Sequence, residues 1–143
     1  MDPLGAAQLA AQAALALYNY ANKVGEAGEK LLALRQNVNS TSAIIPDLEE
    51  IFKEATRAGL LNPDGVKSTQ QMLVESKTLF KEISSIVEKT KKSSIGIWKF
   101  AFKEGQIEEI HKNLDRLHNK LQLRMTVLIY KQQEATMSVQ LLS

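Results

Sequence analysis

The feature that most constrains the fold is a run of twenty uncharged residues, from Pro3 to Asn22. At about 1.5 Å of rise per residue, a helix of this length spans roughly 30 Å, the thickness of the hydrocarbon core of a bilayer. Eight of its residues are alanine, and Gln or Asn interrupts it four times, so it is less apolar than a committed transmembrane helix. Asp2 can cap it, and a proline suits its first position. We expect a helix over residues 3–22 that is core in the resting domain and can enter a membrane when the packing around it loosens.

The composition favours one helical domain without disulfides. The chain has 143 residues, only three prolines and seven glycines, and no cysteine, which excludes thiolate metal sites as well. The net charge of +2 is too small to indicate a nucleic-acid partner by itself. We expect a single domain over residues 1–143, with no cofactor and no metal.

Apolar residues spaced by three and four predict four helices, over residues 3–22, 26–58, 64–91 and 104–139. Turn signals separate them, among them Gly59 and the Asn-Pro-Asp-Gly sequence at 62–65. Short connections then predict an all-α fold, an up-down four-helix bundle with an uncharged N-terminal helix and a long C-terminal helix.

Pro46 lies inside the second predicted helix. The apolar spacing passes through it without losing phase, so we expect one long helix that is kinked there. The alternative is a break near Ile44, with Pro46 opening a new helix.

The stretch from Ser93 to Lys103 holds the only tryptophan and two of the four phenylalanines, alternating with lysine or alanine. We expect an extended loop that places its aromatic side chains under the bundle. Interleaved cations and aromatics also suit an anionic membrane surface or, less well, single-stranded nucleic acid. The candidate lipid-contact residues are Lys89, Lys91, Lys92, Trp98, Lys99 and Lys103.

The sequence does not support catalysis. His111 and His118 are seven residues apart, whereas a ligand pair on one helix usually has a spacing of three or four, and no cysteine completes a zinc set. Adjacent glutamates at 49–50 and 108–109 point about 100° apart and cannot converge on one atom. We expect a protein that is not an enzyme, with solvated glutamates and partly exposed histidines.

The chain resembles a known family over essentially its whole length, and two stretches carry the resemblance. The opening MDPLGAAQLAAQAALALYNYANKV resembles the start of fungal HeLo-like (HELL) N-terminal domains, and IWKFAFKEGQIEEIHKNLDRLHNKLQL resembles their aromatic-then-Lys-Glu entry into a long final helix. The chain departs from the family pattern at Pro46 and in the high alanine content of its first helix. The matching positions are Met1, Asp2, Pro3, Leu4, Trp98, Phe102, Lys103, Glu104, Ile107, Leu114, Leu117 and Leu121.

The resemblance implies a function at membranes. Such domains are similar to the HeLo domain of HET-S and to the four-helix executioner domain of mixed-lineage kinase-like proteins. Such domains often precede a nucleotide-binding receptor domain or an amyloid motif in a longer chain. The role attributed to them is to trigger regulated cell death in fungal heterokaryon incompatibility or defence. We therefore expect a cytoplasmic protein that self-associates on activation, frees its first helix, and targets anionic lipids of the cell membrane. The candidate membrane-insertion residues are Leu4, Leu9, Leu15, Leu17 and Tyr18.

Two other functions stay open. The chain can instead be a soluble helical adaptor that binds partner bundles, in which case the first helix remains buried. Nucleic-acid binding is the weakest of the three, and we expect no such partner.

Overall fold

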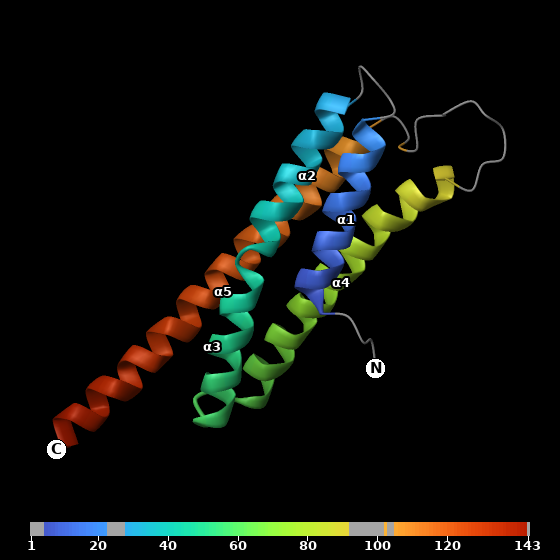
Figure 1. Ribbon diagram of the computed structural model, residues 1–143. Coiled ribbons are helices and arrows are strands. Elements are labelled where there is room, and N and C mark those ends of the chain that lie inside the picture. The colour runs from blue at the N-terminus through green and yellow to red at the C-terminus, as the bar shows by residue number, and fades with distance from the viewer. Residues whose placement is uncertain (1–4, 23–27, 92–101, 103–104, 143) are drawn as a thin grey trace.

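The computed structural model describes residues 5–22, 28–91, 102 and 105–142. Five helices follow one another, and no strand occurs among these residues: α1 (Ala6–Ala21), α2 (Gly28–Ser42), α3 (Ile45–Arg57), α4 (Pro63–Lys91) and α5 (Gln106–Leu142). Figure 1 shows α2 and α3 following each other along one side of the molecule, so that together they form one rod of a four-rod, up-down bundle. The predicted all-α four-helix bundle with a long last helix is therefore confirmed.

The expected single, kinked second helix is wrong, and the alternative of a break is right. Residues 43–44 form a turn between α2 and α3, and Pro46 lies in the first turn of α3. A proline there needs no N–H partner, whereas in a continuous helix its ring would collide with the carbonyl of Ser42. The Ser42 hydroxyl also donates to the carbonyl of Asn39 at 3.1 Å, which helps α2 to end.

Local signals explain the other helix ends. The Asn62 side chain accepts a hydrogen bond from the Gly65 amide at 2.7 Å and so caps α4, with Pro63 as its first residue. Gly59 has φ +70°, and the Leu60 amide donates to the carbonyl of Ala55, which is a glycine-terminated helix end. At the N-terminus, α1 begins at Ala6 after Gly5, three residues later than expected.

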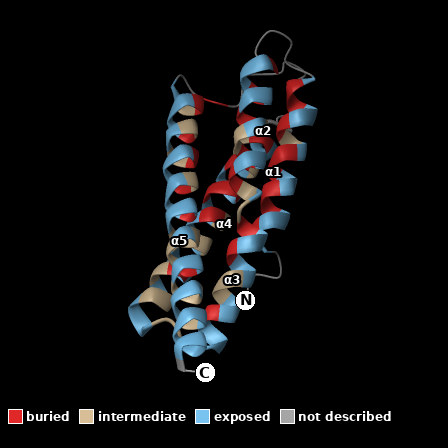
Figure 2. Ribbon diagram, turned by 90° about the vertical axis from the view of Figure 1, so that its left-hand side faces the viewer, coloured by how far each residue is buried: buried red, intermediate tan, exposed pale blue. Residues whose placement is uncertain are grey.

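The core runs along the middle of the bundle (Figure 2). Leu17, Leu31, Phe80 and Leu114, from four different helices, are all fully buried in it. Phe102 is also buried, which agrees with the expected placement of aromatics under the bundle. The rest of the predicted 93–103 loop lies outside the described residues.

Beyond Leu128, α5 has no buried residue up to Leu141. Figure 1 shows this end of α5 projecting past the other helices. The bundle therefore supports the first two thirds of its longest helix and leaves the last turns without a neighbour on most sides.

Candidate functional site

The bundle face of α1 is made mainly of small side chains. Five of its eight buried residues are alanine, and only three are large. This face packs against α2 and α4. Its buried residues are Ala6, Leu9, Ala10, Ala13, Ala14, Leu17, Tyr20 and Ala21.

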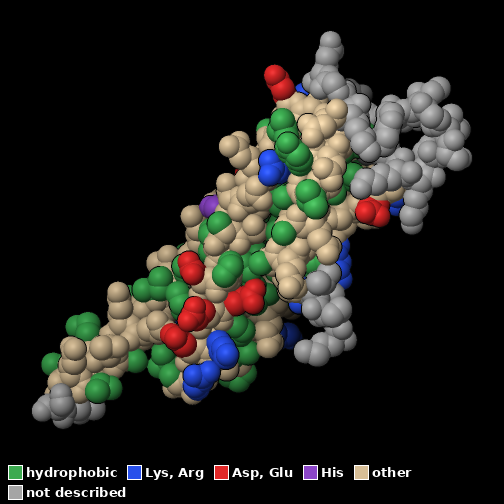
Figure 3. All heavy atoms as spheres, viewed as in Figure 1, with side chains coloured by type: hydrophobic (Ala, Val, Ile, Leu, Met, Phe, Trp, Pro, Cys, Tyr) green, Lys and Arg blue, Asp and Glu red, His purple; other side chains and the backbone are tan. Residues whose placement is uncertain are grey.

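The outer face of α1 is exposed but carries no charge. Leu15 is 60% exposed and Tyr18 is 43% exposed, and the other exposed residues of α1 are alanine, glutamine and asparagine. The expectation that the whole of residues 3–22 is core is therefore wrong for this face. A helix that packs on two neighbours buries only part of its circumference, whatever the polarity of the remainder. Figure 3 shows no acidic or basic side chain on the surface over α1.

An open groove of about 720 Å³ separates the outer face of α1 from α4. Leu9 and Leu15 line it from α1, and Lys81, Glu88 and Lys89 line it from α4. The groove therefore places exposed apolar surface next to two cations and one anion. We call it the α1–α4 groove.

Tyr18 connects the outer face of α1 to α2. The guanidinium carbon of Arg35 lies 4.8 Å from the centre of the Tyr18 ring, which is a cation–π contact. The Nε atom of Arg35 is buried and has no hydrogen-bond partner among the described residues. The side chain is thus positioned by stacking on the ring, and the contact, worth about 0.5–1 kcal/mol at a partly exposed site, helps to hold α1 on the bundle.

The structure brings together only some of the residues that the sequence singled out. Leu9, Leu15 and Lys89 meet at the α1–α4 groove, whereas Leu17 is fully buried in the core. Lys91 is the last residue of α4. Five further candidates lie outside the described residues, namely Leu4, Lys92, Trp98, Lys99 and Lys103.

Sequence reasoning missed the contribution of the middle of α4. Lys81, Ser85 and Lys89 are spaced by four and so lie on one face of that helix, where they line the α1–α4 groove. The spacing was visible in the sequence, but nothing in it indicated that α1 would lie beside this face.

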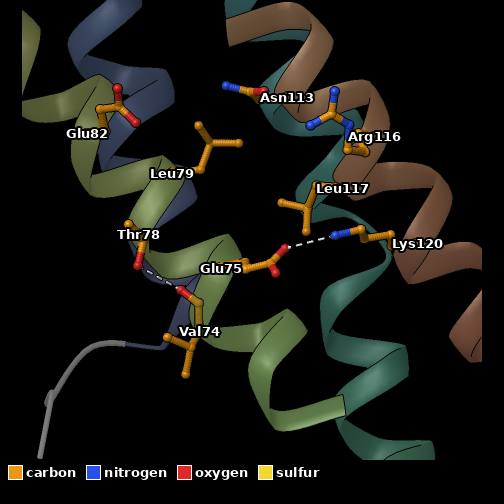
Figure 4. Close-up of a pocket in the computed structure, with 9 residues that line it drawn as sticks. All are labelled: Val74, Glu75, Thr78, Leu79, Glu82, Asn113, Arg116, Leu117 and Lys120. Carbon is orange, nitrogen blue, oxygen red and sulfur yellow. Dashed lines mark hydrogen bonds and ion pairs between the residues drawn. The ribbon is translucent and has the colours of Figure 1, made fainter. Parts of the chain in front are cut away.

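A second hollow, of about 420 Å³, lies between α4 and α5 (Figure 4). Leu79 and Leu117 extend into it from the two helices, and Lys120 forms an ion pair with Glu75 across it at 3.5 Å. Both charged side chains are about half exposed, so the pair contributes roughly 0–1 kcal/mol. This arrangement joins two helices and offers no reactive group.

His111 has a structural partner. The Asn37 side-chain nitrogen lies 2.9 Å from Nδ1 of His111 and donates to a carboxylate oxygen of Asp115 at 3.1 Å, which ties α2 to α5. Within the described part of the chain, no three His, Asp or Glu side chains come close enough to hold a metal ion.

No helix among the described residues combines the length and the apolar character needed to cross a membrane. At 16 residues, α1 is about 24 Å long and falls short of the roughly 30 Å hydrocarbon core. Comparison with known proteins adds no assignment: no family model, no curated protein and no solved structure matches this chain.

Proposed function

We propose that this domain is a membrane-active effector, of the kind that HeLo-like domains supply in regulated cell death. The main support for this proposal is the position of Leu15. It is exposed on an uncharged helix face, and it lines the same groove as Lys89. The exposed part of the Leu15 side chain contributes little to folding, whereas complete transfer of a leucine side chain from water into a bilayer is favourable by about 1.5–3 kcal/mol. The neighbouring lysine adds about 1 kcal/mol at an anionic surface.

The length of α1 favours binding in the plane of the interface over spanning. An interfacial helix needs an apolar face and a polar face, not 20 apolar residues. Once free of the bundle, α1 offers Leu9, Leu17 and Tyr20 on one side, and Gln8 and Gln12 on the other. In the proposed sequence of events, the outer face of α1 contacts lipid first, and the helix then leaves the bundle and turns its former core face toward the acyl chains.

The small side chains of α1 make this release feasible. An alanine buries little apolar area, so most of the hydrophobic stabilisation of α1 comes from its three large buried residues, at about 1.5–3 kcal/mol each. A core helix with leucine at every buried position would be held much more firmly. The resting protein is proposed to be cytoplasmic, and self-association on activation supplies the free energy that frees α1.

The test is dye leakage from vesicles that contain anionic lipid, with the full chain and two matched variants. Leu15→Glu puts a carboxylate on the outer face of α1, whereas Leu32→Glu makes the same change at a partly exposed leucine of α2 outside the α1–α4 groove. We expect both variants to keep the helical circular dichroism of the parent chain. Loss of the first contact between Leu15 and lipid should reduce leakage by about tenfold or more, while the α2 variant leaks like the parent.

Equal leakage by all three proteins would contradict the proposal, and leakage from neutral vesicles as strong as from anionic ones would remove the role of the lysines. Deleting residues 1–22 is a less decisive experiment, because it also removes eight buried side chains and exposes the core of the bundle.

A further inference from the structure

The far half of α5 carries an apolar stripe on the side that faces away from the bundle. Leu123, Tyr130 and Met137 are spaced by seven, so they stay on one face with a drift of about 20° per heptad, and Leu141 continues the line one turn later. Their exposed fractions are 67%, 60%, 60% and 85%. We call these four residues the α5 stripe. Figure 3 shows hydrophobic side chains on the projecting end of α5, with no acidic or basic side chain among them in that view.

The bundle itself does not explain the α5 stripe. Leu121 and Leu128 are fully buried against the other helices. The stripe residues Leu123 and Tyr130 come two positions later, and at about 100° per residue they lie on the opposite side of α5. Four large apolar side chains in one line on a solvent-facing helix side are typical of a helix–helix contact.

The charges beside the α5 stripe indicate what covers it. From Met125 to Leu141 the chain has only two charged residues, Lys131 and Glu134, and they are three positions apart. When two identical helices run in opposite directions, the lysine of each helix can lie beside the glutamate of the other. Both pairs across the contact then have opposite charges. We propose that a second copy of this chain docks on the α5 stripe, antiparallel to the first.

The register of this pairing follows from the spacing. With a two-fold axis at Gln132, Leu123 lies opposite Leu141 of the second copy and Val127 lies opposite its Met137. Tyr130 then lies opposite Glu134 of the second copy, with Lys131 one residue further along and within reach of that carboxylate. In each of these layers of facing residues, the side chains occupy the a and d positions of a heptad repeat. Glu134 is the single polar residue at these positions, and it fixes the register.

The parallel arrangement is disfavoured by the same residues. It would place Glu134 directly against Glu134 of the second copy inside the contact, and like charges in juxtaposition weaken association. Leu60, from the turn after α3, adds one wall to a groove of about 690 Å³ along Tyr130, Met137 and Leu141, so the surface beside the stripe is hollowed.

This association goes beyond the proposed function, because it needs neither a membrane nor the release of α1. One helix pair is a small interface, at the lower end of the size range of specific contacts. We therefore expect a reversible dimer that dissociates on dilution, rather than an obligate one.

Charge reversal tests the pairing in the full chain by sedimentation velocity over a range of concentrations. Lys131→Glu and Glu134→Lys should each weaken self-association by about tenfold or more, because each places like charges across the contact. An equimolar mixture of the two variants should dimerise like the parent chain, because every pair across the contact is then of opposite sign. Lys112→Glu, on an exposed position of α5 before the stripe, is the control and should dimerise normally.

The orientation is tested by disulfide trapping, which is clean because the chain has no cysteine of its own. Under oxidising conditions, a mixture of Leu123→Cys and Leu141→Cys proteins should give the mixed disulfide. Each protein alone should give little, whereas a parallel pair would give the opposite pattern.

Three results would overturn the proposal: a parent chain that stays monomeric at every concentration, charge variants that dimerise like the parent, or a chain that binds neutral vesicles through the stripe while it remains monomeric. A circular dichroism melt of each variant shows that loss of association is not loss of fold.

Discussion

Gly28 lies where the first turn of α2 meets the end of α1. A β-carbon built on it would be 2.8 Å from the carbonyl oxygen of Ala21, a backbone atom that cannot rotate away. Gly28→Ala should therefore lower the free energy of unfolding by about 1–3 kcal/mol through overpacking, although alanine is the better helix former. Chemical denaturation measures this directly.

The matched control is Gly5→Ala, at the position before α1. A β-carbon there meets nothing within 4 Å, and φ is −76°, so alanine fits without strain. We expect a smaller change, within about 1 kcal/mol. Equal effects at the two glycines would show that the approach of Gly28 to α1 does not limit the packing of the two helices.

Leu15 and Leu17 show how far single residues can be predicted. Both are leucines in an uncharged helix, yet one is 60% exposed and the other is fully buried. The sequence pattern could not separate them, because alanine and leucine occur on every side of residues 6–21 and no charged residue marks the solvent face. The choice depends on which neighbours lie beside α1, and that is tertiary information.

At the scale of elements, the helices were predictable and the break in the second one was not. Strong signals at Gly59 and Pro63 placed two helix ends within a residue or so. At Pro46 the local preference for a break competed with an apolar spacing that ran straight through it. Ile45 and Leu48 are both fully buried, and they hold α3 in a direction that differs from that of α2. The apolar spacing therefore continues through Pro46 although the helix is broken at residues 43–44.

Replacing Pro46 tests whether the proline or the packing makes the break. With Pro46→Ala the steric reason for ending α2 disappears, but the buried Ile45 and Leu48 remain. We expect the turn at residues 43–44 to persist in backbone chemical shifts. Stability should fall by about 0.4–1 kcal/mol, because the unfolded chain gains freedom. Helical shifts throughout residues 42–47 would instead show that the proline alone separates α2 from α3.

At the scale of the whole molecule, the bundle divides into a packed body and a projecting helix end. The sequence predicted the length of α5 from its leucine spacing, but that spacing continues past the point where the bundle stops. The sequence could not show that the other helices stop covering α5 near Leu128, because this depends on the lengths and directions of α3 and α4. The α1–α4 groove was hidden for the same reason, since it needs two helices that are far apart in sequence.

Removal of residues 133–143 tests the packed body of the bundle without the projecting end of α5. This segment has no buried side chain among its described residues, and the contact between Gln132 and Glu54, at 3.4 Å, is kept. We expect the free energy of unfolding of the shortened chain to lie within about 0.5 kcal/mol of that of the parent, as is usual for changes at exposed positions. Self-association should be lost, because half of every layer in the antiparallel contact is gone. Vesicle leakage by the shortened chain then shows whether the proposed dimer contributes to the proposed release of α1. Unchanged leakage would mean that leakage depends on the body of the bundle alone. A loss of both leakage and self-association would connect the α5 stripe to activation.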